Sequence, residues 1–407
     1  MDNRVEKYAK LIIEMGVNIQ EGQYLMINSP IETAYFARAL TRFAYQRGAK
    51  KVYVEYHDEL LLKLNYDYAP DEAFLEYPQW VAKGMETLGK NNCAFIRISA
   101  SNPELLKDVD SKKISMANKT ARIALAAHRK QVTNGEVAWC IASVPTPEWS
   151  QKVFPQLSQE DAIKELWEKI YIANRINEEY PVKAWQKHID EITKHTTYLN
   201  SQKIKSLHYI APNTDLVIEL PKGHKWEGGG GYNLKGTYFI ANMPTEEVFT
   251  MPHKYSVNGK ISSTKPLNYG GKLIDEFTLY FEKGKIVDFE AKLGYNDLKH
   301  LIETDKGSAY LGEVAIVPIS SAVNKTNVLF YNTLFDENAS CHLAIGSCYA
   351  ENIEGGKNMS DEELEAAGAN VSLNHVDFMV GSDELNITAT TWDGEIFDVL
   401  KNGEWAL

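Results

Sequence analysis

Apolar residues in the first half of the chain occur in two patterns, as short continuous runs and as longer stretches with helical spacing. The short runs predict buried strands at residues 24–28 (YLMIN), 51–56 (KVYVEY), 93–99 (CAFIRIS) and 137–143 (VAWCIAS). Between the first two runs, residues 31–47 have the spacing of an amphipathic helix, and Gly48 follows as a stop signal. Strands that alternate with helices are typical of βαβ units, so the pattern predicts an α/β fold with a mainly parallel sheet for this half of the chain.

The pattern changes near Ser206, where short β-rich runs separated by Gly and Asn turns replace the earlier alternation. Helical spans are predicted near residues 296–304 and 360–367, and the second begins with a capping box of Ser360 and Glu363. Three dipeptides predict hairpins, because both central residues of a type I′ turn need a positive φ: Asn258-Gly259, Asp393-Gly394 and Asn402-Gly403. This half predicts an α+β fold with a mixed or antiparallel sheet.

The two patterns together predict two domains. Residues 1–195 would form an N-terminal α/β domain, which the helical residues 160–197 close or flank. Residues 196–407 would form a C-terminal α+β domain that carries the chemistry. A length of 407 residues agrees with this division, at roughly 150 residues per domain.

Composition narrows the classes of function. The chain has 43 Lys and Arg against 55 Asp and Glu, a net charge of −12, which argues against a nucleic-acid or anionic-membrane surface. No apolar run reaches the roughly 18 residues of a transmembrane helix, and the charged start lacks the apolar region of a signal peptide. The four cysteines have no CxxC spacing, so free thiols in a reducing cytoplasm are expected.

Several common catalytic motifs are absent from the sequence. It contains no GxSxG elbow, no P-loop and no HExxH pair, which argues against the usual serine-hydrolase, NTPase and zinc-peptidase patterns. The four glycines at 228–231 lack GxGxxG spacing and predict a flexible turn.

Polar residues inside apolar runs of the second half are the remaining candidates for chemistry. If the run SLNHVDFMVG is a strand, His375 and Asp377 point to one face, while Val376 and Phe378 point to the other. An inward polar pair needs hydrogen bonds or a metal. Taken alone, a hydrogen-bonded His–Asp pair is the simpler interpretation.

Three further segments add polar residues of the same kind. Glu313 stands alone in the hydrophobic run YLGEVAIVP, where a carboxylate needs a partner. His342 lies among small and apolar residues in LFDENASCHLAIG. Glu246 and Glu247 are adjacent acids in NMPTEEVF, so one can face inward while the other faces solvent.

Three carboxylates and two imidazoles form a donor set that suits divalent ions such as Zn²⁺, Co²⁺, Mn²⁺ or Mg²⁺. A dinuclear site about 3.5–4 Å across could polarise a carbonyl and supply a hydroxide. The spacing alone leaves two alternatives open, a metal site and a set of structural polar residues. The residues concerned are Glu247, Glu313, His342, His375 and Asp377.

These segments resemble the motifs of the thermophilic-type metallo-aminopeptidases, family M29. The N-terminal stretch VNIQEGQYLMINSPIETAYFARAL and the ending DGEIFDVLKNGEWAL are also similar to the ends of that family, so the resemblance spans essentially the whole chain. The internal motifs that carry it are NMPTEEVFTMP (242–252), YLGEVAIVP (310–318), LFDENASCHLAIG (334–346) and HVDFMVGS (375–382).

The resemblance implies a two-domain chain, two divalent metal ions in the C-terminal domain and a homodimer. It implies Tyr349 as an active-site tyrosine. Of the implied ligands, we expect Glu313 to bridge the two metals, and a role for it as a proton shuttle is the alternative. Glu246 is the alternative to Glu247, which is favoured because it immediately precedes the apolar Val248. The implied ligands are Glu247, Glu313, His342, His375 and Asp377.

The implied activity is hydrolytic removal of the N-terminal residue from peptides with a free α-amine. One alternative is another two-metal amidohydrolase or a phosphoesterase, which would need cationic groups that the metal-bearing motifs scarcely contain. The other is a non-catalytic α/β ligand-binding protein.

Overall fold

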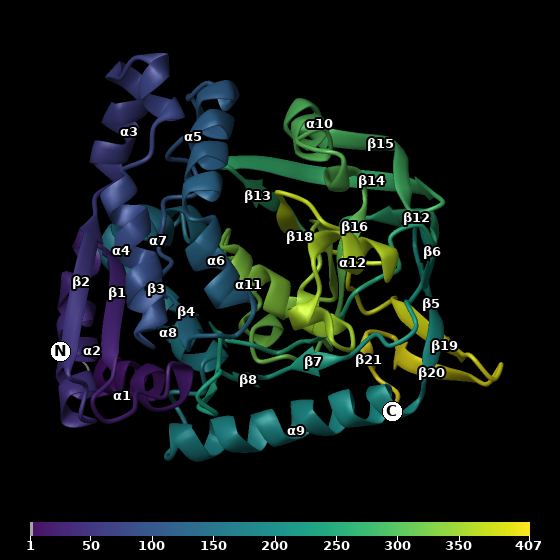
Figure 1. Cartoon of the computed structure of the whole chain (residues 1–407), viewed down its shortest axis with the longest axis horizontal. Helices are drawn as coiled ribbons and strands as arrows, with labels where there is room; N and C mark the ends of the chain where they lie inside the picture. The colour runs from purple at the N-terminus through teal and green to yellow at the C-terminus, as the bar shows by residue number, and fades with distance from the viewer. Residues whose placement is uncertain (1–2) are drawn as a thin grey trace. The chain divides into compact units, whose positions relative to one another are not determined.

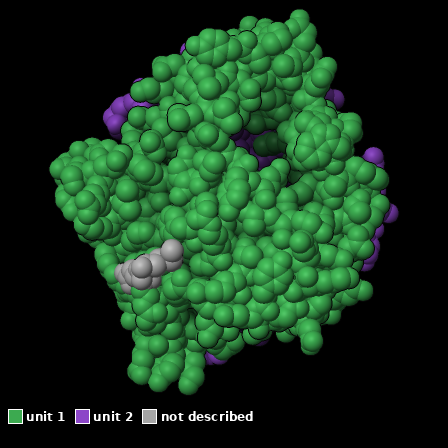
Figure 2. All heavy atoms as spheres, turned by 90° about the vertical axis from the view of Figure 1, so that its left-hand side faces the viewer, with its two compact units in different colours: residues 1–186, 230–244 green, residues 187–229, 245–407 purple. Residues whose placement is uncertain are grey.

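The structure is a computed structural model that describes residues 3–407. The chain forms two compact units (Figure 2). Unit 1 comprises the residues up to Gln186 together with Gly230–Pro244, and unit 2 comprises Lys187–Gly229 and Thr245–Leu407. The domain boundary predicted between residues 195 and 196 lies within helix α9 (Pro181–Ser201). The boundary itself stays a prediction.

Unit 1 is built on a parallel sheet with the strand order β10-β4-β3-β1-β2 (Figure 1). The α/β fold with a parallel sheet predicted for the first half is therefore confirmed. The four predicted strands all form, and a fifth comes from the later segment Asn242–Met243. The strands are β1 (Tyr24–Pro30), β2 (Lys51–His57), β3 (Ala94–Ile98), β4 (Trp139–Ala142) and β10 (Asn242–Met243).

Helices connect these strands, and some of them begin at a residue whose side chain caps the helix. Asp58 accepts hydrogen bonds from the backbone of Leu60 and Leu61 at the start of α3, and Ser158 caps α8. A short hairpin of β8 (Gly231–Tyr232) and β9 (Tyr238–Phe239) completes the unit. The helices are α1 (Asn3–Leu11), α2 (Ala34–Gln46), α3 (Glu59–Tyr68), α4 (Gln79–Lys90), α5 (Ser111–Ala124), α6 (Ala126–Thr133), α7 (Pro147–Val153) and α8 (Gln159–Ala173).

Unit 2 contains two antiparallel sheets, as predicted for the second half. The larger sheet has the order β13-β14-β12-β6-β5-β19-β20-β21, and β15 pairs with β14. Its strands are β5 (Ile204–Ala211), β6 (Thr214–Glu219), β12 (Val257–Ser262), β13 (Leu267–Tyr269), β14 (Lys272–Glu282), β15 (Lys285–Leu293), β19 (Asn386–Thr391), β20 (Ile396–Lys401) and β21 (Glu404–Trp405).

The smaller sheet of unit 2 has the order β18-β17-β16-β11-β7. Its strands are β7 (Glu227–Gly228), β11 (Val248–Thr250), β16 (Leu311–Ile316), β17 (His342–Gly346) and β18 (His375–Met379). Both helical spans predicted in this half form, and the capping box at Ser360 is present. The helices are α9, α10 (Tyr295–Ile302), α11 (Thr333–Asp336) and α12 (Asp361–Ala366).

Two of the three predicted hairpins are confirmed. Asp393-Gly394 separates β19 from β20, and Asn402-Gly403 separates β20 from β21 with positive φ at both residues. The third prediction was wrong, because Asn258-Gly259 lies inside strand β12. Gly259 is needed there for another reason: its φ is +118°, and a Cβ would lie 2.1 Å from the carbonyl oxygen of Asp215 on β6.

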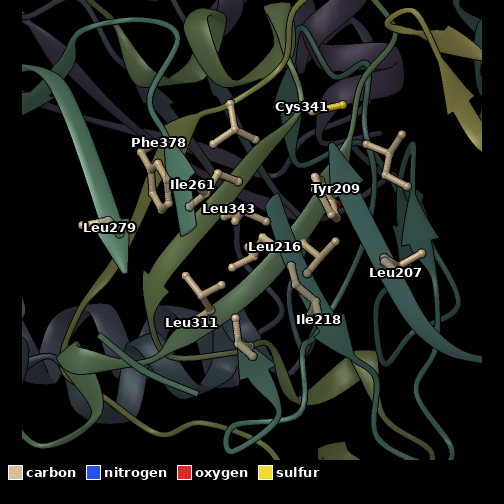
Figure 3. Packing of buried hydrophobic residues seen from close by; sticks show 14 of the residues in the cluster. Leu207, Tyr209, Leu216, Ile218, Ile261, Leu279, Leu311, Cys341, Leu343 and Phe378 are labelled. Carbon is tan, nitrogen blue, oxygen red and sulfur yellow. The ribbon is translucent and has the colours of Figure 1, made fainter. Parts of the chain in front are cut away.

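The two sheets of unit 2 share one hydrophobic core (Figure 3). Leu216 and Ile218 on β6 contribute to it from the larger sheet, and Leu343 on β17 and Phe378 on β18 from the smaller one. Because neighbouring side chains in a strand point to opposite faces, His342 and Asp377 must leave the smaller sheet on the face away from this core. The core thus determines which face can carry polar chemistry.

Helices long and apolar enough to cross a membrane are not found among residues 3–407.

Candidate metal centre

Adjacent strands of the smaller sheet place their polar side chains on one face. Ala344 on β17 lies directly across from Glu313 on β16 and from Asp377 on β18. Because alanine has a short side chain, it leaves room above β17 for the two carboxylates. A register shift between Leu311 and Glu313 marks a bulge in β16 at this point.

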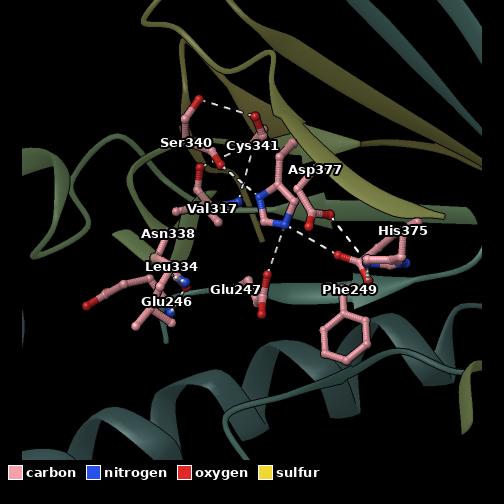
Figure 4. A network of polar contacts seen from close by, with 12 residues as sticks. Glu246, Glu247, Phe249, Val317, Leu334, Asn338, Ser340, Cys341, His375 and Asp377 are labelled. Atoms are coloured by element: carbon pink, nitrogen blue, oxygen red, sulfur yellow. Dashed lines mark hydrogen bonds and ion pairs between the residues drawn. The ribbon is translucent and has the colours of Figure 1, made fainter. Parts of the chain in front are cut away.

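The side-chain atoms converge on two groups that share one residue (Figure 4). His342 Nε2 lies 3.0 Å from Glu247 Oε2 and 3.3 Å from Glu313 Oε1. His375 Nε2 lies 3.6 Å from Glu313 Oε2 and 3.4 Å from Asp377 Oδ1. Within each group the potential ligand atoms all lie within 4.8 Å of one another. Glu313 therefore presents one carboxylate oxygen to each histidine.

Backbone carbonyls orient both imidazoles. His342 Nδ1 donates to the carbonyl oxygen of Ser340 at 3.1 Å, and His375 Nδ1 donates to that of Ser347 at 2.6 Å. With Nδ1 bonded to a carbonyl, Nε2 is the nitrogen that faces the carboxylates, and it can bind a metal ion once its proton is lost. This is the arrangement in which histidine commonly binds metal ions.

Glu247, Glu313 and His342 are buried, whereas His375 and Asp377 are half-buried. The group carries an excess of acidic oxygens. Burial raises the pKa of Glu313. Burial alone would lower the pKa of His342, but its hydrogen bonds to Glu247 and Glu313 raise it well above the usual range. Asp377 Oδ1 is buried and accepts no hydrogen bond among the residues described. A network held by protein groups alone would be expected to satisfy this buried oxygen with a hydrogen bond. Its lack of one, beside two oriented imidazoles, fits a site for a divalent cation better.

Comparison with known proteins agrees with this geometry. The family model for the thermophilic metalloproteases, M29, matches residues 1–405. The chain belongs to this family. Its fold also matches a solved structure, wild-type AmpT from Thermus thermophilus, with a TM-score of 0.93 at 36% identity over 100% of this chain and 99% of that one.

Curated M29-type relatives cover the same length. Aminopeptidase AmpS of Bacillus subtilis (strain 168) is 51% identical over 403 residues, which span 99% of this chain and 98% of that protein. Aminopeptidase 2 of Geobacillus stearothermophilus is 50% identical over 405 residues, 100% of this chain and 98% of that protein. The resemblance inferred from the motifs is confirmed, and membership of a metalloprotease family implies the use of divalent metal.

The two adjacent acids of this M29 chain point in different directions. Figure 4 shows the side chains of Glu246 and Glu247 pointing apart. Glu247 reaches His342, whereas Glu246 Oε2 lies 3.8 Å from His188 Nε2 on α9. Glu247 is thus brought to the cluster and Glu246 is not.

Tyr349 lies beside the cluster. Its ring centroid is 4.7 Å from that of His375 and 6.0 Å from that of Phe249. Burial and the nearby carboxylates, Glu313 first among them, raise the pKa of Tyr349 well above its usual value. Its hydroxyl therefore keeps its proton at neutral pH.

Glu337 is a buried acid of the same region that the sequence analysis did not single out. Burial, followed by the charges of Asp377 and Glu247, raises its pKa well above the usual range. It lies on the 3-10 turn Glu337–Ala339, five residues before His342. The period-two pattern used to find inward side chains does not apply to such a turn, and only its place in the motif LFDENASCHLAIG could have marked it.

Proposed function

We propose that this M29 member is a metal-dependent aminopeptidase, which hydrolyses the bond after the first residue of a peptide with a free α-amine. The curated relatives that match this chain over nearly their full length are named aminopeptidases. The observation that carries the proposal is the position of Glu313, whose two oxygens face two separate histidine-containing groups. Of the two alternatives, membership of a peptidase family supports neither a phosphoesterase nor a non-catalytic binding protein.

We assign one metal ion to each of the two groups of side chains described above. Glu247, Glu313 and His342 would hold one divalent ion, and Glu313, His375 and Asp377 the other, with Glu313 bridging them. Glu337 is an additional carboxylate close enough to interact with Asp377 and Glu247. Imidazole and carboxylate donors suit Zn²⁺, Co²⁺, Mn²⁺ and Mg²⁺, so the identity of the metal is not decided by the donor set. When bound, such ions polarise a carbonyl and lower the pKa of a coordinated water to about 7.

The chain's own groups then have separate tasks. The carbonyls of Ser340 and Ser347 hold the imidazoles in one tautomer. Tyr349, still protonated, would donate a hydrogen bond to the carbonyl oxygen of the scissile peptide as negative charge develops on it. Contacts of this kind are typically worth about 3 kcal/mol.

A panel of aminoacyl chromogenic substrates and their N-acetylated counterparts tests the activity. We expect cleavage of the free amines alone, loss of cleavage after treatment with a chelator, and recovery when a divalent metal is restored. Cleavage of acetylated substrates at a comparable rate would contradict an exopeptidase.

We also propose that the chain forms a homodimer, as the family resemblance implies. Helix α3, the segment after it and the start of α4 expose several large apolar side chains on unit 1, and exposed apolar patches mark interaction sites. Light scattering after gel filtration should give twice the chain mass, and Leu61→Glu should give the monomer. The most exposed members are Leu60, Leu61, Tyr68, Leu75 and Trp80.

A cytoplasmic location is part of the same proposal. All four cysteines are free, three of them buried, as expected for a protein kept in a reducing compartment.

A further inference from the structure

We propose that Asn338 is a positioning residue that fixes the direction of Glu247 by holding one peptide group in the loop before β11. This inference rests on the proposed metal-dependent function, because it concerns how a ligand is presented. Asn338 is fully buried and lies on the 3-10 turn that follows α11. The bonds of its side-chain amide go to backbone atoms of Glu246 and Leu334.

The oxygen and the nitrogen of the Asn338 side-chain amide each form a hydrogen bond. Its Oδ1 accepts a hydrogen bond from the backbone N–H of Glu246 at 2.7 Å, and its Nδ2 donates to the carbonyl oxygen of Leu334 at 2.8 Å (Figure 4). The second bond fixes the rotamer of Asn338, so the first has a defined direction. The loop that carries Glu247 is thereby tied to the turn that carries Glu337.

A second side chain binds the same peptide group. His188 Nε2 on α9 lies 2.8 Å from the carbonyl oxygen of Thr245. The carbonyl of Thr245 and the N–H of Glu246 belong to one peptide plane, so His188 holds its oxygen and Asn338 holds its N–H. Rotation of that plane would break both bonds.

The orientation of this plane determines which acid enters the cluster. Glu246 lies on the His188 side, at 3.8 Å from Nε2, while Glu247 continues to His342 at 3.0 Å. Glu246 and Glu247 are chemically equivalent, so their side chains alone do not select between them. The two bonds to the peptide group make that selection. Loss of a group that orients a metal ligand commonly lowers metal affinity by 10–100-fold.

The experiment measures Co²⁺ binding by visible absorption and chelator competition, and measures the melting temperature of the metal-free protein. Asn338→Ala should weaken binding of Co²⁺ at least tenfold and alter its absorption spectrum. The matched control is Asn174→Ala in unit 1, where another fully buried asparagine donates to the carbonyl oxygen of Ile170. The control should lose thermal stability and keep wild-type Co²⁺ affinity and spectrum.

His188 gives an independent test of the same peptide plane, also if Asn338→Ala fails to fold. His188→Ala should weaken Co²⁺ binding, and His188→Gln, which keeps an N–H donor, should restore most of it. Wild-type affinity and spectrum in both Asn338→Ala and His188→Ala would overturn the inference while leaving the proposed function intact. Failure of the wild-type protein to bind any of Co²⁺, Zn²⁺, Mn²⁺ and Mg²⁺ would overturn the proposed function itself.

Discussion

Gly312 lies directly against the backbone carbonyl of Ser347: a Cβ at position 312 would be 2.2 Å from that oxygen. The same carbonyl oxygen accepts the Nδ1 hydrogen of His375 at 2.6 Å. Gly312, next to the bulge in β16, therefore lets the Ser347 carbonyl lie where it can orient His375 on β18. Position 312 needs a glycine because the Ser347 carbonyl comes so close to it, and not because its φ is positive.

Gly312→Ala should disturb one half of the metal centre. The methyl group must displace the Ser347 carbonyl, which removes the bond that orients His375, while His342 keeps its own bond to Ser340. We expect the number of tightly bound Co²⁺ ions to fall from two to one per chain. Gly231→Ala is the control, because a Cβ there meets no atom within 4 Å. Two ions retained in Gly312→Ala would show that the carbonyl does not orient His375.

Glu313→Gln should abolish turnover while the fold is retained. The amide keeps the shape of the side chain, but it replaces one anionic oxygen by an N–H₂ group that cannot bind a cation. A decrease in kcat/KM of at least about a thousandfold is expected from the loss of a bridging group, which corresponds to about 4 kcal/mol. Circular dichroism and the melting temperature check the fold. Glu246→Gln should have a much smaller effect, and equal losses in the two variants would contradict the assignment of the acids.

Much of this arrangement follows from sequence patterns, for reasons that can be stated for each residue. His375 and Asp377 share a face because they are two apart in a strand whose other face, at Phe378, joins the core. The apolar runs that became β1, β3 and β4 are mostly buried or half-buried, as suits strands of a parallel sheet covered on both faces. The run KVYVEY became the edge strand β2, in which Lys51, Tyr53 and Tyr56 are exposed.

Other features depend on long-range packing that a local pattern does not contain. Asn242–Met243 joins the sheet of unit 1 although it lies about 100 residues after β4. Asn258-Gly259 has the composition of a turn, yet its close contact with the backbone of β6 places it inside a strand. Asn338 was not predicted to matter because its partners, Glu246 and Leu334, meet only in the folded chain.

The affinity for divalent metal should increase as the pH is raised from about 6.5 to about 9. Burial alone would lower the pKa of His375, but Asp377 and Glu313 raise it to about 9 in the metal-free protein. A raised pKa keeps the imidazole protonated at neutral pH, so an incoming metal must displace a proton. Affinity should rise by up to about tenfold per pH unit for each proton displaced, and the contribution of His375 should level off above about pH 9. Chelator competition at pH 6.5, 7.5, 8.5 and 9.5 measures this, and a constant affinity would contradict it.

Tyr349→Phe should lower kcat without changing metal binding. The substitution removes the hydroxyl and keeps the ring that packs against His375 and Phe249. If the hydroxyl donates to the developing negative charge, kcat should fall by about a hundredfold while KM and Co²⁺ affinity stay near their wild-type values.

Tyr209→Phe is the matched control for this variant. Tyr209 is another fully buried tyrosine of unit 2, and its hydroxyl has no hydrogen-bond partner among the residues described, so its removal should leave kcat unchanged. A wild-type kcat in Tyr349→Phe would mean that the tyrosine serves only to pack against His375. A parallel loss of Co²⁺ affinity would place its effect on the metal site and not on the substrate.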